Sequence, residues 1–302
     1  MRIVIVGEGM VELSRADGDL WRLGYGGDTL NTAIHLARLG QDVRYATALG
    51  EDVFSDDLLR DWAGEGIDTS LIQRDPARMP GLYAISTDAQ GERSFAYWRG
   101  ESAARRTLSL PGADAVMAAA ERADLLLFSL ITLAILDDIG RDRLIALAER
   151  VRAHGGRVAF DGNYRPRLFR DQAEAQALCR RAVAVCDIGL PTLEDEAMLN
   201  GATSAADVQA HWQGLGASEV VVKLGAEGCL LSDIGIVPPP QRLSPRDTSG
   251  AGDAFNAGYL AARLEGLSPG DAAVRGHRLA GWTVMRPGAI PARDGELATL
   301  FG

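Results

Sequence analysis

The sequence predicts an α/β protein: a three-layer α/β/α sandwich with a mainly parallel central sheet and a small β-sheet lid. Short apolar runs rich in β-branched residues, such as 2–6 and 219–222, are typical of strands buried on both faces, and amphipathic helical stretches separate them. Two other stretches, about 11–25 and 81–99, alternate polar and apolar residues around turn signals. They predict exposed hairpins, which would supply the strands of the lid.

Composition favours a cytoplasmic enzyme. The chain has 302 residues, 47% hydrophobic and 24% charged, with no internal repeat or Pro/Ser-rich linker, so we expect one domain spanning 1–302. A net charge of −10 argues against nucleic acid as a partner. No apolar run is long enough to cross a bilayer, and the first residues resemble a buried strand more than a signal peptide. The three cysteines have no C-x-x-C spacing, which suits a reducing compartment.

The N-terminal half opens with a central strand over 2–6. Gly7-Glu8-Gly9 after it is similar to a dinucleotide-binding fingerprint, but Glu12 takes the place of the third glycine, so that hypothesis is set aside. The elements expected next are a hairpin turning at 17–19, a helix over 32–39 capped by Asp28 or Thr29, a strand over 43–49, a helix over 54–64 and a hairpin turning at 88–91.

The C-terminal half continues the alternation of strands and helices. Strands are expected over 123–128, 158–161, 183–190 and 219–223, and helices over 136–154, 254–265 and 269–284, with Ser268 as the N-cap of the last.

The most informative stretch is R-D-T-S-G-A-G-D-A-F-N-A-G, residues 246–258. Gly250 and Gly252 flank Ala251, so a ligand can approach the backbone closely. The helix that follows would point free N–H groups at an anion, and Asp253 stands at the same place as a candidate general base. The alternative is that Asp253 only caps the helix.

The string D-T-S-G-A-G-D resembles the C-terminal signature of the ribokinase-like (PfkB) carbohydrate kinases. G-G-D-T-L-N followed by A-I-H-L-A-R-L-G, over 200 residues earlier, is similar to the family's N-terminal signature. The resemblance implies a ribokinase-like fold, with Asp253 as the catalytic base and Gly250, Ala251 and Gly252 as the anion hole. It places the sugar against four residues of the N-terminal signature: Gly26, Gly27, Asp28 and Asn31.

The resemblance extends to other site residues. Asn163 and Arg165 match an element that faces both the sugar and the ATP phosphates, although Asp161 beside them could simply cap a turn and Arg165 could form a surface ion pair. Lys223, the single lysine of the chain, falls with Gly225 and Gly228 in a motif that leads into the nucleotide site. On the second hairpin, the expected sugar contacts are Tyr83, Tyr97 and Arg99, with core packing as the alternative for the two tyrosines.

The magnesium ligands stay open. The family places N-x-x-E near residue 192, whereas this chain reads P-T-L-E-D-E, with Thr192 and Asp195 as the nearest fit. An acidic helix start explains these carboxylates equally well. We therefore expect Mg²⁺ to be carried mainly by the ATP phosphates.

Four segments are similar to the family members that phosphorylate 2-keto-3-deoxygluconate, an acid sugar: G-Y-G-G-D-T-L-N, P-G-L-Y, G-E-R-S-F-A-Y-W-R and N-Y-R-P-R. The resemblance implies ATP-dependent transfer to the terminal hydroxyl, giving 2-keto-3-deoxy-6-phosphogluconate. A carboxylate on the substrate would account for Arg99 and Arg165, because burying an unpaired guanidinium is costly. A fructokinase, a ribokinase and a non-catalytic sugar sensor remain as alternatives, and the galactonate epimer and a monovalent-cation requirement stay open. Exposed lid strands favour a homodimer.

Overall fold

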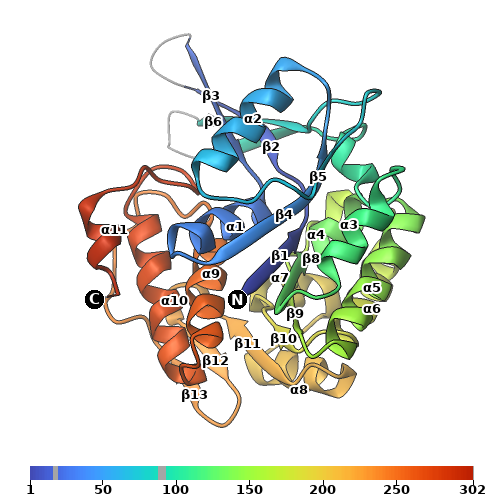
Figure 1. The fold of residues 1–302 in the computed structure, drawn as a ribbon. Helices are drawn as coiled ribbons and strands as arrows, with labels where there is room; N and C mark the ends of the chain where they lie inside the picture. The colour runs from blue at the N-terminus through green and yellow to red at the C-terminus, as the bar shows by residue number, and fades with distance from the viewer. Residues whose placement is uncertain (16–19, 88–92, 302) are drawn as a thin grey trace.

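The computed structural model describes residues 1–15, 20–87 and 93–301, and within them it contains a central sheet of nine strands and a separate sheet of four (Figure 1). The order across the central sheet is β13 (Gly235–Val237), β12 (Cys229–Leu231), β11 (Glu219–Lys223), β10 (Ile188–Gly189), β9 (Arg157–Asp161), β8 (Leu125–Ser129), β1 (Arg2–Val6), β4 (Asp42–Leu49) and β5 (Ile72–Arg74). The strands from β11 to β5 are parallel, while β12 and β13 pair antiparallel at one edge. The predicted three-layer architecture is confirmed.

Helices cover both faces of this sheet, one group on each side (Figure 1). One face carries α1 (Asp28–Arg38), α2 (Val53–Gly64), α9 (Ala251–Leu264) and α10 (Pro269–Val284). The other carries α3 (Ala113–Ala120), α4 (Leu130–Ile135), α5 (Asp138–Ala153), α6 (Gln172–Val183), α7 (Leu193–Asn200) and α8 (Ala205–Leu215). The short pieces are η1 (Ala103–Arg106), η2 (Pro166–Leu168), η3 (Gly225–Glu227) and α11 (Gly295–Thr299).

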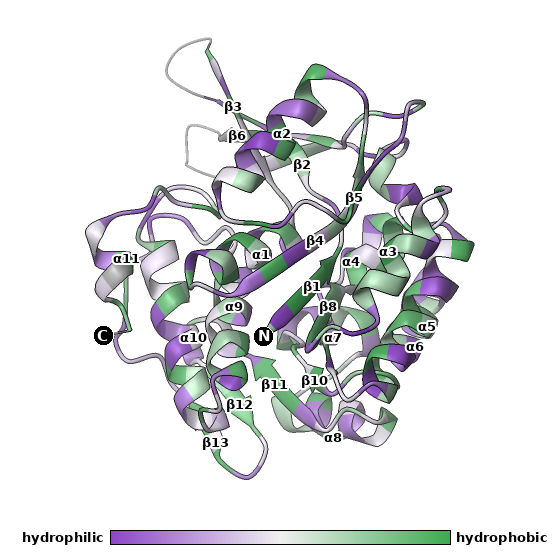
Figure 2. Cartoon of the chain, in the orientation of Figure 1, coloured by the Kyte–Doolittle hydropathy of each residue, from purple (hydrophilic) through white to green (hydrophobic). Residues whose placement is uncertain are grey.

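Strand β1 explains why the sequence runs are continuously apolar. Ile3 and Ile5 point into the core on the α1 side, while Val4 and Val6 point into the core on the α5 side. Figure 2 shows the same hydrophobic character along β1 and β8. Among the described residues, none of the helices combines the length and apolar character that crossing a membrane would require.

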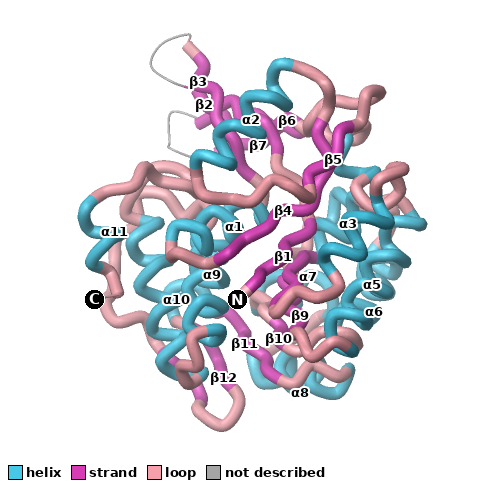
Figure 3. The backbone as a smooth tube through the Cα atoms, in the orientation of Figure 1, coloured by secondary structure: helices cyan, strands magenta, loops and turns pink. Residues whose placement is uncertain are grey.

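The second sheet forms the lid, which lies beyond one end of the central strands (Figure 3). Its strands are β2 (Met10–Arg15), β3 (Trp21–Gly26), β6 (Leu82–Thr87) and β7 (Arg93–Trp98). Two antiparallel hairpins, β2–β3 and β6–β7, are joined by parallel pairing of β2 with β6. Both lid hairpins are therefore confirmed, while their predicted turns at 17–19 and 88–91 lie outside the described residues.

Several predicted boundaries were wrong. Helix α1 begins at Asp28 with Gly27 as its N-cap, so neither Asp28 nor Thr29 caps it. The expected strand over 183–190 is reduced to β10, because the alanine-rich α6 continues to Val183. By contrast, α10 is confirmed as predicted, and the Ser268 side chain accepts a hydrogen bond from the N–H of Asp271.

Candidate active site

The glycine turn at the start of α9 forms the centre of the site. Gly250 is the N-cap and has a left-handed backbone (φ 68°), which glycine adopts without strain. Helix α9 begins at Ala251, so Asp253 is its third residue rather than its cap, and the capping alternative is excluded. The first N–H groups of α9 have no partners within the helix, and the Asp253 carboxylate belongs to the same first turn.

Asp253 is held by α1. Asn31 Nδ2 donates to Asp253 Oδ2 at 2.8 Å, and Thr32 Oγ1 donates to the Asp253 carbonyl at 3.3 Å. The pKa of Asp253 is raised to about 8, mainly by burial and also by the negative charge of Asp28, while the hydrogen bond from Asn31 opposes the shift. A carboxyl group with a pKa near neutrality is well matched to accepting a proton from an alcohol.

Asp28, the first residue of α1, is close enough to Asp253 for its charge to act on that carboxyl group. Asn163 Nδ2 donates to Asp28 Oδ2 at 3.3 Å, which brings together residues from α1 and from the loop after β9. Burial raises the pKa of Asp28 as well, against a hydrogen bond from Ser129. The negative charge of Asp28 raises the pKa of Asp253, and the charge of Asp161 raises the pKa of Asp28.

The two glycines before α1 are required by close packing. A Cβ on Gly26 would lie 2.2 Å from the Tyr83 hydroxyl, and one on Gly27 would lie 2.2 Å from the Glu8 carbonyl oxygen. Tyr83 donates to Glu12 and stacks on Tyr97, with the two ring centroids 5.9 Å apart. These contacts place the predicted sugar residues of the lid next to those of α1.

Arg99 has a partner that the sequence analysis missed. Its guanidinium forms an ion pair with Glu8, whose side chain is fully buried after β1. The argument that Arg99 would be unpaired without an acid substrate is therefore wrong. Glu8 already balances the charge of Arg99.

Lys223 forms a closed polar triangle beneath the glycine turn. Its Nζ lies 3.0 Å from Asp161 Oδ1 and 3.1 Å from Asn256 Oδ1, and Asn256 Nδ2 donates to Asp161 Oδ2 at 3.0 Å. Asp161 is thus the counter-ion of Lys223 rather than a turn cap. A Cβ on Gly252 would lie 3.8 Å from Lys223 Nζ, so the ammonium group adjoins the anion-binding turn.

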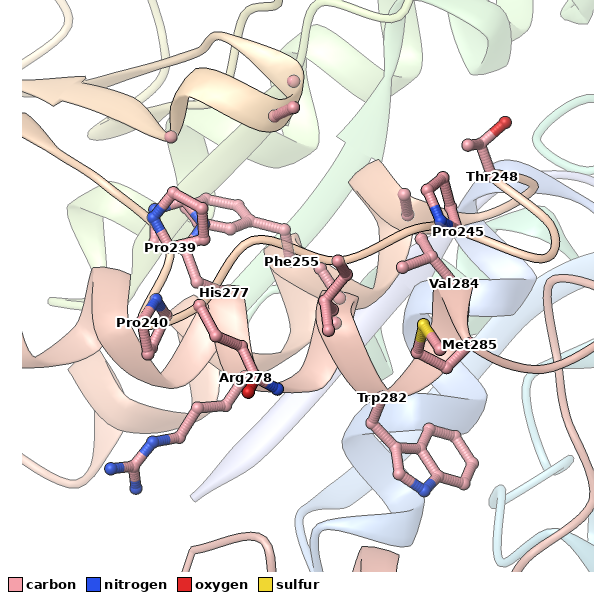
Figure 4. Close-up of a pocket in the computed structure, with 18 of the residues that line it drawn as sticks. Pro239, Pro240, Pro245, Thr248, Phe255, His277, Arg278, Trp282, Val284 and Met285 are labelled. Carbon is pink, nitrogen blue, oxygen red and sulfur yellow. The ribbon is translucent and has the colours of Figure 1, made fainter.

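A cavity of about 880 Å³ opens on the other side of the turn, between the 239–245 segment and α10 (Figure 4). Its lining includes predicted nucleotide residues: Lys223, Gly225, Gly228, Ala251 and Gly252. The remaining wall is largely apolar and was not predicted, with Phe255, His277, Trp282 and Met285 among its residues. A mostly apolar cavity with a few convergent polar groups suits a flat heteroaromatic base.

The acidic segment after β10 divides between two roles. Asp195 Oδ1 lies 3.2 Å from Arg165 NH1, whose side chain is half exposed, so the ion-pair alternative for Arg165 holds in this structure. Glu196 is buried and accepts hydrogen bonds from Trp212 Nε1 and Asn200 Nδ2. Across 1–15, 20–87 and 93–301, no three His, Cys, Asp or Glu side chains gather as a metal site would need.

A carboxyl group of raised pKa in the first turn of a helix, a buried lysine and an adjoining cavity are the groups that a phosphotransferase site needs. The sequence pattern of the pfkB family of carbohydrate kinases matches residues 2–294, and the chain belongs to that family.

The chain is 45% identical to the 2-dehydro-3-deoxygluconokinase of Dickeya dadantii (strain 3937) over 298 residues, covering 95% of this chain and 96% of that protein. It is 45% identical to the 2-dehydro-3-deoxygluconokinase of Escherichia coli (strain K12) over 303 residues, covering 97% and 98%. The fold is similar to that of aminoimidazole riboside kinase from Salmonella enterica, solved with aminoimidazole riboside and an ATP analogue. The TM-score is 0.84, with 24% identity over the whole of both chains.

Proposed function

We propose that this chain transfers the γ-phosphoryl group of ATP to the terminal hydroxyl of 2-keto-3-deoxygluconate, also called 2-dehydro-3-deoxygluconate, giving 2-keto-3-deoxy-6-phosphogluconate. The observation that carries the proposal is the partly buried Asp253 carboxyl, of raised pKa, in the N-terminal turn of α9. The choice of substrate is supported by the two relatives of 45% identity that bear this activity in their names.

Asp253 accepts the proton of the attacking hydroxyl, and Asn31 fixes the carboxylate oxygen that does so. The N–H groups at the start of α9 receive the charge of the transferred phosphoryl group, and their dipoles are already oriented before the reaction begins. Lys223 adds a positive charge behind the turn, and its contacts with Asp161 and Asn256 prevent it from moving away.

The acid sugar lies between α1 and the lid. Asp28, Asn31 and Asn163 bind its hydroxyl groups, and Gly26 and Gly27 leave room for it against the backbone. Tyr83 and Tyr97 cover its apolar face from the lid. Arg99, fixed by Glu8, binds the carboxylate with help from Arg165, whose half-exposed side chain would exchange its ion pair with Asp195 for the substrate.

ATP occupies the 880 Å³ cavity, with its base against Phe255 and His277 and its phosphates running past Gly225 and Gly228 toward Lys223. Magnesium neutralises the negative charge of the phosphates when it is bound. Since no acidic cluster among the described residues would hold the ion by itself, the phosphates supply most of its ligands. A cytoplasmic location fits the three cysteines, which are all free thiols.

ATP turnover by the purified protein tests the proposal on a panel of 2-keto-3-deoxygluconate, its galactonate epimer, fructose, ribose and gluconate. We expect kcat/KM to be highest on the keto acids and to fall at least about 1,000-fold in Asp253→Asn, which still binds ATP. A preference for fructose or ribose would keep the kinase and reject the carboxylate role of Arg99. Sugar binding without turnover on any substrate would make the protein a sensor.

We also propose a homodimer formed through the lids. The lid face opposite Tyr83 and Glu12 exposes large apolar side chains, among them Trp21, Leu23 and Trp98. A second copy of the lid presents the same apolar strands and would cover them. Light scattering should then give twice the 32.1 kDa of one chain, and Leu23→Glu together with Trp98→Glu should reduce the mass to one chain.

A further inference from the structure

Helix α1 carries a polar face along its whole length. Asp28, Asn31, Thr32, His35 and Arg38 follow one another at helical spacing. The first three lie at the sugar end, where Asn31 and Thr32 contact Asp253. The last two donate to carbonyl oxygens of the segment 287–291, which follows α10. One face of α1 therefore reaches from the candidate base to a segment far away in the sequence.

That segment lies directly against the anion-binding turn. A Cβ built on Gly250 would lie 2.5 Å from Ala289 Cβ and 3.1 Å from the Ala289 carbonyl oxygen. Gly250 is the N-cap of α9, where the proposed phosphoryl site begins. The position of Ala289 therefore decides how the first peptide of the turn is oriented.

His35 holds that same carbonyl. Its Nε2 lies 3.0 Å from the Ala289 oxygen, and its ring is buried and edge-on to Trp282. Burial lowers the pKa of His35 to about 4, so the imidazole is neutral at physiological pH and carries one N–H. Because a carbonyl only accepts, that N–H is on Nε2.

The other ring nitrogen shows that this contact has a cost. With the proton on Nε2, Nδ1 is a buried acceptor, and it has no hydrogen-bond partner among the described residues. Leaving a buried polar atom unpaired is unfavourable, and an apolar side chain would avoid that cost. The hydrogen bond to Ala289 is the contact that a histidine provides here and an apolar residue would not.

Two further contacts hold the neighbours of Ala289. Asp247 accepts a hydrogen bond from the N–H of Gly288, and Arg38 donates to the Pro291 carbonyl at 2.7 Å. Asp247 also accepts from the N–H of Ser249, which lies one residue before Gly250. The segment is thus held on both sides of Ala289, and His35 fixes the one residue that touches the turn.

We propose that His35 is a positioning residue for phosphoryl transfer: its Nε2–H fixes the Ala289 carbonyl against Gly250 and so sets the shape of the anion-binding turn. The inference rests on the proposed function of that turn as the γ-phosphoryl site. His35 itself touches neither substrate.

The test compares two substitutions of similar size. His35→Met removes the donor, and His35→Gln replaces the ring N–H with an amide N–H. Tyr259→Phe is the control, because it deletes a buried hydrogen bond to Glu219 elsewhere on α9. Each variant is assayed for kcat, for KM of ATP and of the acid sugar, and by calorimetry for Kd of ADP and of the non-hydrolysable ATP analogue AMP-PNP.

We expect His35→Met to lower kcat about tenfold and to weaken AMP-PNP more than ADP, since only the analogue has a γ-phosphoryl group in the turn. The KM of the acid sugar should stay within about twofold, and His35→Gln should recover most of the loss. Tyr259→Phe should lose stability with unchanged kinetics.

Equal loss of AMP-PNP and ADP affinity would overturn the inference, as would a His35→Met enzyme that is less stable but kinetically normal. So would a His35→Gln variant as impaired as His35→Met. The nucleotide affinities are measured without sugar. If the wild type turns over no acid sugar, the proposed function fails while the AMP-PNP and ADP values still decide the role of His35.

Discussion

The proposed sugar half and the proposed nucleotide half of the site are built from different surfaces. On the proposed sugar half, Asp28 and Asp253 are both partly buried, and this burial raises the pKa of both carboxyl groups. On the proposed nucleotide half, the ammonium group of Lys223 is paired with Asp161 and Asn256, and much of the cavity wall is apolar. The environment of the sugar half thus disfavours the ionised carboxylates, whereas the charge of Lys223 on the nucleotide half has partners.

The difference indicates that the carboxyl groups of the sugar half, and not Lys223, reduce the stability of the folded protein when they ionise. Placing two carboxyl groups together in a buried site disfavours the ionised state that a base needs. The matched triangle around Lys223 keeps a cation in place without such a penalty, because every polar atom in it has a partner. We therefore expect removing a carboxyl group from the sugar half to raise stability while activity falls. A change at the phosphate turn of the nucleotide half should lower activity with little change in stability.

The largest expected effect is on stability. The folded pKa of Asp253 is about 8 and the unfolded value is near 4, so between these values the folded protein binds the proton and the unfolded chain does not. The free energy of unfolding of the wild type must then fall as pH rises from about 4 to 8. Asn does not titrate, so Asp253→Asn should be more stable at pH 8 by roughly 3–5 kcal/mol, with a smaller gain at pH 5.

Urea unfolding of both proteins at pH 5, 6.5 and 8 measures this difference. The control is Asp114→Asn, which changes an exposed carboxylate paired with Arg143 and should alter stability by less than about 1 kcal/mol at every pH. A constant difference between Asp253→Asn and the wild type across the three pH values would show that Asp253 ionises normally in the folded state.

The second prediction separates the two glycines of the turn. Gly252→Ala should fold normally, because its Cβ meets only Lys223 Nζ, at 3.8 Å, and a helical alanine is favourable. The added methyl group projects into the cavity and should lower kcat/KM about 100-fold by displacing the phosphoryl group. Gly250→Ala should instead lose stability, because alanine disfavours the left-handed backbone and would collide with Ala289.

Thermal unfolding and ATP turnover of the two variants decide between these outcomes. Wild-type turnover by a folded Gly252→Ala would mean that the transferred phosphoryl group does not lie over this turn. A Gly250→Ala variant as stable as the wild type would show that the segment around Ala289 can move away.

Candidate residues for the sugar half were easier to name from the sequence than the wall of the cavity, for a physical reason. Asp28, Asn31 and Asp253 follow glycine-rich turns and fall in the two family signatures, so they could be named as candidates even though helix capping also explained the two aspartates. Phe255 and Trp282 lie at apolar helical spacing, and a helix that lines a cavity has the same pattern as one that lines the core. The apolar wall of the cavity could not be predicted for that reason.

Pairings between distant residues were also out of reach. The sequence placed Arg99 on the lid but could not show that Glu8, after β1, neutralises it. Glu8 follows the apolar run 2–6, and an acidic residue at that place could have suggested a basic partner. We considered it only as part of a dinucleotide-binding fingerprint. The fold itself was predictable because parallel strands are buried on both faces and therefore read as apolar runs, whereas the short β10 was hidden by the helical α6 before it.

The smallest predicted effect concerns the coupling inside the sugar half. Since the negative charge of Asp28 helps to raise the pKa of Asp253, Asp28→Asn should lower that pKa. The base is then deprotonated at lower pH, so the acid limb of kcat/KM should move to lower pH even where the maximal rate falls through lost sugar contacts.

The measurement is the acid limb of the normalised pH profile of kcat/KM, recorded for each variant from pH 5.5 to 9.5. Asp195→Asn, another buried carboxyl group at this edge, should leave the midpoint in place. If Asp28→Asn also leaves it in place, burial alone sets the pKa of the base, and the two carboxyl groups do not act on each other.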